Sequence, residues 1–208
     1  FYDDEEIEKE QIREGLAWAD VIGVGPGMGT GQQAEDILYT ILAEGRKPLL
    51  IDADGLNLLA GRMEVLAQYP APVIVTPHLG EFGRISGVSV EEWKEAPLYL
   101  TKRFAHKYHL TVVCKDSRTV ISDGSEEIFI NTSGNSGMAT AGSGDVLSGI
   151  LMGLLAQGLS AIDAASLGVY FHGAAGDMAA AQKGEYSMIA GDIITQTAEI
   201  LKKRGAVL

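Results

Sequence analysis

Apolar residues in the first third of the chain alternate between short continuous runs and helical spacing. Residues 19–24 form a short run rich in β-branched side chains, and a glycine-rich loop follows at residues 25–31. Apolar residues then recur at positions 34, 37, 38, 41 and 42, the spacing of one helix face. Residues 48–51 and 73–75 are continuous apolar runs, which is typical of strands covered by helices on both faces. The pattern predicts an α/β domain with a parallel sheet and short connections.

The second half of the chain changes from this alternation to hairpins and then to helices. A helical stretch over residues 89–109 contains Pro97, which predicts a kink or a division there. From Asp145 onward the apolar spacing is helical. We find no internal repeat, linker or low-complexity tract, so the pattern favours a single domain. Between these two helical parts, three short apolar runs predict antiparallel strands: residues 110–114, 119–122 and 127–130.

Composition and charge exclude several classes of protein. The 208 residues are 46% hydrophobic and 21% charged, as in ordinary globular proteins. The net charge of −12 argues against a nucleic-acid partner, which needs clustered positive charge. A single cysteine, Cys114, cannot form an internal disulfide, so we expect a reducing cytoplasm. No apolar run reaches the about 18 residues of a membrane span, and the acidic residues 1–10 are unlike a signal peptide, so we expect no membrane association.

The densest concentration of small residues lies at residues 131–145, where four glycines precede a predicted helix that begins near Asp145. Glycine lets backbone N–H groups approach a ligand, and a helix N-terminus adds unpaired donors and partial positive charge. These features predict an anion site. The alternative is a surface loop followed by an acidic residue in the first turn of a helix. The length of the segment favours function, because a simple connection seldom exceeds about 12 residues.

Asp145 lies beside this predicted anion site. A carboxylate in that place can accept the proton of a substrate hydroxyl that attacks phosphorus. We expect it to act mainly by orienting the hydroxyl, while the loop donors and a metal ion stabilise the developing charge.

Several motifs together resemble a known family. The segment at residues 142–149, which opens Gly142-Ser143-Gly144-Asp145, is similar to the anion-hole and catalytic-aspartate signature of the ribokinase-like superfamily. Six further segments resemble the ADP/ATP-dependent NAD(P)H-hydrate dehydratase family, in order along the chain: residues 25–29, 52–57, 76–82, 115–119, 170–177 and 190–194. The resemblance implies an α/β fold, a ribokinase-like three-layer α/β/α sandwich with a mixed, mostly parallel central sheet. Nothing matches the start of the family's domain, so we expect residues 1–208 to be one such domain lacking its N-terminal portion.

The resemblance implies a lyase for metabolite repair. Family members use ADP or ATP with Mg²⁺ to dehydrate the S epimer of hydrated NADH or NADPH, by phosphorylating the ring hydroxyl and eliminating phosphate. A homo-oligomer, a tetramer in the family, is also implied. Two alternatives stay open: a kinase of the same superfamily acting on a vitamin-precursor alcohol, and a nucleotide-binding module without catalysis.

The family's binding residues carry over onto matching positions. Asp145 would be catalytic and would contact the hydrated nicotinamide. Asp116 departs from many relatives, which have glycine there, and a carboxylate beside phosphates would repel them unless it points away. The resemblance assigns the nucleotide to eight residues: Lys115, Asp116, Ser117, Arg118, Thr119, Gly142, Ser143 and Gly144. For Lys115 the alternative is a solvated lysine that closes a strand.

Four more residues are assigned with their alternatives. His78 would contact the dinucleotide, although a histidine after a strand is more often a satisfied polar residue. Gly27 and Gly29 would let the dinucleotide approach the backbone; the alternative, a tight strand-to-helix turn, is compatible with that contact and would explain Gly25. Glu81 would help to hold Mg²⁺ through water.

Two aspartates and several other side chains receive no firm assignment. Asp52 and Asp54 either face the site from a strand end or cap the following helix. The remaining histidines, His106, His109 and His172, give no functional signal separable from packing.

Overall fold

A single six-stranded sheet organises the fold of this computed structural model. The structure describes residues 9–205; for residues 203–205 it describes the backbone alone. Most of the acidic stretch at residues 1–10 lies outside these residues. The strands stand in chain order across the sheet; β1 to β4 are parallel, and β4, β5 and β6 form two antiparallel pairs. The mixed, mostly parallel sheet is thus confirmed. The strands are β1 (Ile22–Val24), β2 (Leu49–Ile51), β3 (Val73–Val75), β4 (Thr111–Cys114), β5 (Thr119–Ser122) and β6 (Phe129–Asn131).

Helices follow the predicted pattern, with two additions, at Lys9–Trp18 and Leu79–Ser86. Pro97 divides the helical stretch as expected, because its ring fits the first position of a new helix. The helix at Lys9–Trp18 is mostly solvent-exposed, and its apolar face is short: Ile12 and Leu16 are partly buried against the core. The helices are α1 (Lys9–Trp18), α2 (Gln32–Glu44), α3 (Asp54–Leu58), α4 (Leu79–Ser86), α5 (Val90–Glu95), α6 (Pro97–Tyr108), α7 (Ser143–Ala156), α8 (Ala161–Lys183) and α9 (Ala190–Gly205), with short 3₁₀ helices η1 (Met63–Gln68) and η2 (Ser136–Met138).

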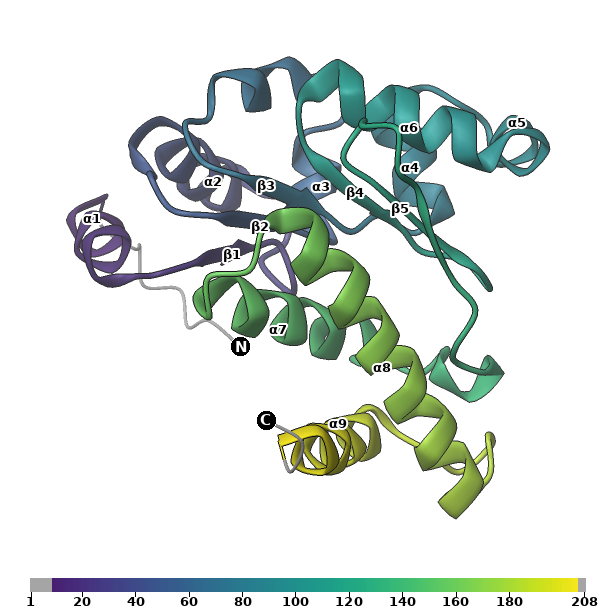
Figure 1. Ribbon diagram of the computed structural model, residues 1–208. Helices are drawn as coiled ribbons and strands as arrows, with labels where there is room; N and C mark the ends of the chain where they lie inside the picture. Colours follow the sequence, from purple (N-terminus) through teal and green to yellow (C-terminus); the bar gives the residue numbers. More distant parts are fainter. Residues whose placement is uncertain (1–8, 206–208) are drawn as a thin grey trace.

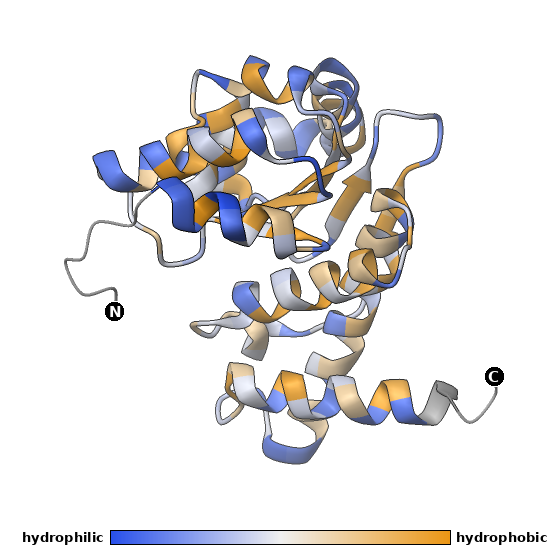
Figure 2. Ribbon diagram, turned by 90° about the vertical axis from the view of Figure 1, so that its left-hand side faces the viewer, coloured by the Kyte–Doolittle hydropathy of each residue, from blue (hydrophilic) through white to orange (hydrophobic). Residues whose placement is uncertain are grey.

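Strand side chains alternate between two hydrophobic cores, one on each face of the sheet. Val73 and Val75 pack into the core that α2, α4 and α6 cover, whereas Ile74, between them, packs into the core under α7 and α8. Figure 1 shows these two groups of helices on opposite sides of the strands. In Figure 2 the strands are mostly hydrophobic and the outer helices are mixed. The three-layer α/β/α arrangement is therefore confirmed.

The C-terminal helix α9 lies away from the sheet and packs on the second half of α8 (Figure 1). A small separate apolar cluster joins the two, with Ala175 and Ala179 on α8 and Ile193 on α9.

Among the described residues, no helix is both long and apolar enough to cross a bilayer.

The short connections determine where polar residues meet. β2, β3 and β4 are parallel neighbours, so their carboxyl ends lie at one edge of the sheet. Asp52 follows β2, His78 lies just beyond β3, and Lys115 follows β4. In open α/β sheets this edge is where ligands bind.

Candidate functional site

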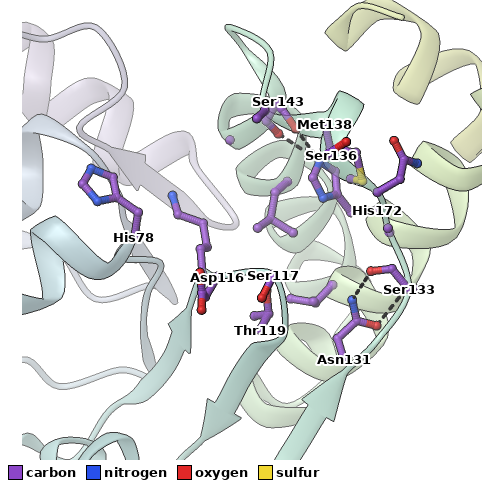
Figure 3. Close-up of a pocket in the computed structure, with 18 of the residues that line it drawn as sticks. His78, Asp116, Ser117, Thr119, Asn131, Ser133, Ser136, Met138, Ser143 and His172 are labelled. Atoms are coloured by element: carbon purple, nitrogen blue, oxygen red, sulfur yellow. Dashed lines mark hydrogen bonds between the residues drawn. The ribbon is translucent and has the colours of Figure 1, made fainter. Parts of the chain in front are cut away.

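A cavity of about 710 Å³ opens at this edge, a volume within the range of ligand sites. Residues from the ends of β3 and β4, from β5 and β6, and from α7 and α8 line it. Figure 3 shows His78 on one side of the cavity and Asn131 with Ser133 on the other. Seven predicted site residues line the cavity: His78, Lys115, Asp116, Ser117, Thr119, Ser143 and Gly144. Arg118, Gly142, Asp145, Glu81, Gly27 and Gly29 do not.

The first turn of α7 forms one wall. Gly142 precedes the helix with a φ of 84°, a left-handed conformation that glycine adopts without strain. The N–H of Ser143 donates to Thr140 O at 3.2 Å, but no described residue accepts a hydrogen bond from the N–H of Gly144 or Asp145. These unpaired donors and the helix dipole make the turn suited to an anion, as the sequence predicted.

Lys115 brings a positive charge to this turn. Its Nζ lies 2.9 Å from Asp52 Oδ1, and only 23% of the lysine side chain is exposed. A Cβ on Gly144 would stand 3.7 Å from that Nζ, so the ammonium lies directly beside the first turn of α7. The alternative of a solvated lysine is therefore wrong.

Neither Asp52 nor Asp54 caps the helix that follows them; Asp52 is buried and Asp54 is partly exposed. α3 has no side-chain cap at its N-terminus, so that alternative is wrong. Asp52 is 2% exposed and also accepts a hydrogen bond from Ser148 Oγ at 2.9 Å. Asp54 Oδ2 accepts from Gly29 N at 2.9 Å and so fastens the glycine loop.

Asp145 lies next to Gly144 in the same turn, and its side chain is exposed. No side chain of the described residues bonds to its carboxylate. Its carboxylate is therefore unpaired among the described residues, at a turn that is suited to an anion.

His78 and Glu81 cap α4 together. His78 Nδ1 accepts from the N–H of Gly80 at 3.0 Å, and Glu81 Oε2 accepts from His78 N at 2.8 Å. The His78 ring is about half exposed, whereas Glu81 is 6% exposed. The described residues contain no cluster of three or more His, Cys, Asp or Glu side chains suited to a metal ion.

The loop after β1 needs its glycines for different reasons. Gly27 and Gly29 have φ values of 68° and 73°, and nothing described lies within 4 Å of an added Cβ. Gly25 has a φ of 124°, and an added Cβ would lie 1.8 Å from Asp52 O. Gly25 is thus required by the tight turn, while the surfaces of the other two stay open for contact. A second cavity, of about 420 Å³, lies beside this loop and is lined by Gly25, Met28 and Ser148 among others.

Sequence reasoning missed His172. The ring is 9% exposed, and its Nε2–H donates to Ser143 O at 2.9 Å, at the start of α7 (Figure 3). Burial is the main cause that lowers the pKa of His172 to about 4; the nearby Lys115 ammonium also lowers this pKa, whereas the hydrogen bond to Ser143 O raises it. The imidazole is therefore neutral near pH 7. Its place in an alanine-rich helix gave no signal beyond packing.

Asp177 was also missed as a site residue. Its carboxylate accepts from Gly134 N at 2.9 Å and from Asn135 Nδ2 at 3.0 Å. It thereby holds the loop that forms one wall of the cavity.

Comparison with known proteins gives consistent similarities. The family model described as NAD(P)H-hydrate dehydratase matches residues 3–199. The chain is 42% identical over 185 residues to the bifunctional NAD(P)H-hydrate repair enzyme Nnr of Moorella thermoacetica, which covers 89% of this chain but only 35% of that enzyme. The chain thus spans about a third of that relative's length.

Two solved structures are similar in fold and sequence. The ADP/ATP-dependent NAD(P)H-hydrate dehydratase of Bacillus subtilis, co-crystallised with ATP and Mg²⁺, is 28% identical with a TM-score of 0.79, over 91% of this chain and 68% of that one. A ribokinase-like superfamily protein of Enterococcus faecalis is 34% identical with a TM-score of 0.82, over 95% and 69% of the two chains. The ribokinase-like fold is therefore confirmed.

Proposed function

This chain belongs to the NAD(P)H-hydrate dehydratase family, and from that premise we propose that it dehydrates the S epimer of hydrated NADH or NADPH. ADP or ATP supplies a phosphoryl group to the ring hydroxyl, and the phosphate then leaves. The products are NADH or NADPH, inorganic phosphate and the shortened nucleotide, AMP or ADP.

One observation carries the proposal: a lysine ammonium and unpaired backbone donors meet beside Gly144. Lys115 Nζ lies 3.7 Å from the position of a Cβ at this glycine, and the N–H groups of Gly144 and Asp145 have no described acceptor. A phosphate placed there would receive both the positive charge and the hydrogen bonds, which is how phosphoryl transfer is stabilised. The cavity of about 710 Å³ beside them gives the nucleotide room.

Asp145 would orient the ring hydroxyl of the hydrate for attack on phosphorus and accept its proton late. The exposed, unpaired carboxylate beside Gly144 supports this role. Phosphorylation turns the hydroxyl into a good leaving group, and the lone pair of the adjacent ring nitrogen expels the phosphate. The elimination therefore needs no strong base.

The nucleotide would lie along residues 115–119 and against the turn at residues 142–144. Thr119, Ser117 and Lys115 offer donors on the cavity wall. Mg²⁺, arriving with the nucleotide, would neutralise phosphate charge, and Glu81 would hold it through water. Gly27, Gly29 and His78 would contact the dinucleotide.

Three wider features are part of the proposal. The described strands all belong to one sheet, which supports a single dehydratase domain over residues 1–208. The homo-oligomer rests on the family resemblance, and the cytoplasmic location rests on the single cysteine, Cys114, which cannot form an internal disulfide.

The test is turnover in purified protein. With Mg²⁺ and ADP or ATP, we expect the protein to restore the near-ultraviolet absorbance of reduced nicotinamide from its hydrate. Asp145→Asn should abolish turnover and leave nucleotide binding largely intact, because the amide cannot accept the hydroxyl proton. Asp163→Asn, in the first turn of α8, is the matched control and should behave as wild type. Unaltered turnover in Asp145→Asn would refute the role of this carboxylate.

A further inference from the structure

Asp52 is a buried carboxylate at the end of β2 whose hydrogen bonds link three parts of the fold. Its Oδ1 accepts from Lys115 Nζ at 2.9 Å and from Ala53 N at 2.9 Å. Its Oδ2 accepts from Ser148 Oγ at 2.9 Å. A carboxylate 2% exposed is costly to bury, and these donors, one of them charged, compensate the loss of water.

This carboxylate lies behind the candidate phosphate site and does not line it. Lys115 lines the larger cavity, and Ser148 lines the smaller one, but Asp52 lines neither. A Cβ on Gly144 would stand 3.8 Å from Asp52 Oδ2, almost the same distance as from the lysine Nζ. The ion pair therefore packs against the first turn of α7.

A lysine needs such a partner if it is to act as a fixed charge. Its ammonium sits on a flexible four-carbon stem and carries three donors. One donor bonds to Asp52, which leaves two for a ligand in the cavity. The bond from Ser148, in the second turn of α7, in turn fixes the orientation of the carboxylate relative to that helix.

We propose that Asp52 is a positioning residue: with Ser148, it holds the Lys115 ammonium at the N-terminus of α7, so that this charge and the unpaired N–H groups bind the same phosphate of the nucleotide. The proposal rests on the proposed function for the identity of the ligand, a nucleoside diphosphate or triphosphate. Asp52 touches no reacting atom and acts through Lys115.

A double-mutant cycle tests this. We expect Asp52→Asn to lower kcat by about 10- to 100-fold, the worth of a charge-assisted hydrogen bond, with the KM for the dinucleotide hydrate nearly unchanged. Lys115→Met should lower kcat at least as much. Adding Asp52→Asn to Lys115→Met should then cause no further loss, because the residue through which Asp52 acts is already gone. If Asp52 acted independently of Lys115, the two losses would instead multiply, and that result would overturn the proposal.

A second cycle and a second readout keep the test decisive. If thermal unfolding shows that Asp52→Asn is not folded, a second double-mutant cycle, of Ser148→Ala with Lys115→Met, replaces the first. Ser166→Ala on α8 is its matched control. Nucleotide affinity, titrated with ADP and with ATP, is measured for every variant and should show the same lack of additivity. Binding without turnover in the wild type would refute the proposed dehydration, yet the affinity cycle would still decide the role of Asp52.

Discussion

His172 makes a specific prediction about stability and pH. Burial is the main cause that lowers its pKa to about 4 in the folded protein, whereas the pKa of an unfolded histidine is about 6.5. Between these values the unfolded state binds the proton and the folded state does not. The free energy of unfolding should therefore rise with pH through this window, and the contribution of His172 to it should be fully present above about pH 6.5. Each pKa unit corresponds to about 1.4 kcal/mol, so acidification to about pH 4 should remove about 3 kcal/mol through this residue.

Urea denaturation at a series of pH values measures the effect. Carboxylates titrate over part of the same range, so the informative quantity is the difference between wild type and His172→Gln. Glutamine keeps a donor for Ser143 O but has no titrating group. We expect the variant's stability to fall less steeply between pH 6.5 and 4 than that of wild type. Identical pH dependence in the two proteins would refute the reasoning.

Two further pairs of variants probe the packing around the site. Gly25→Ala should prevent folding or destabilise the protein severely, because its Cβ would lie 1.8 Å from Asp52 O. Gly27→Ala should lower the free energy of unfolding by only about 1–2 kcal/mol, because of its left-handed backbone. Equal thermal stability of these two variants would contradict this expectation. Lys115→Met should lower the free energy of unfolding by about 3–5 kcal/mol, because the Asp52 carboxylate stays buried and uncompensated. Adding Asp52→Asn should recover much of that loss in urea denaturation, and a further drop in stability would argue against a buried charge as the cause.

Much of the fold was predictable because burial leaves a pattern in sequence. The runs at residues 48–51 and 73–75 are strands because both faces of this sheet are covered, so no polar residue interrupts them. Pro97 divides two helices for a local steric reason. The helix at Lys9–Trp18 was missed because it is mostly exposed and its apolar face is short, with only Ile12 and Leu16 packed against the core.

The candidate site was predictable only in part. Glycines and an aspartate at the start of α7 follow each other in sequence, so the sequence alone was enough to predict an anion site there. Asp52 and Ser148 lie 96 positions apart, and only the folded sheet brings them together. His172 resembles its packed neighbours in α8, and its bond to the first turn of α7 depends on how the two helices pack.

Product analysis of a single incubation tests the proposed function most directly. Wild-type protein is mixed with the hydrate of NADH, Mg²⁺ and ADP or ATP, and phosphate, shortened nucleotide and reduced dinucleotide are quantified together. We expect all three in equal amounts, with no phosphorylated dinucleotide remaining. A stable phosphorylated product would instead identify a kinase, and an unchanged nucleotide would contradict phosphoryl transfer at this site.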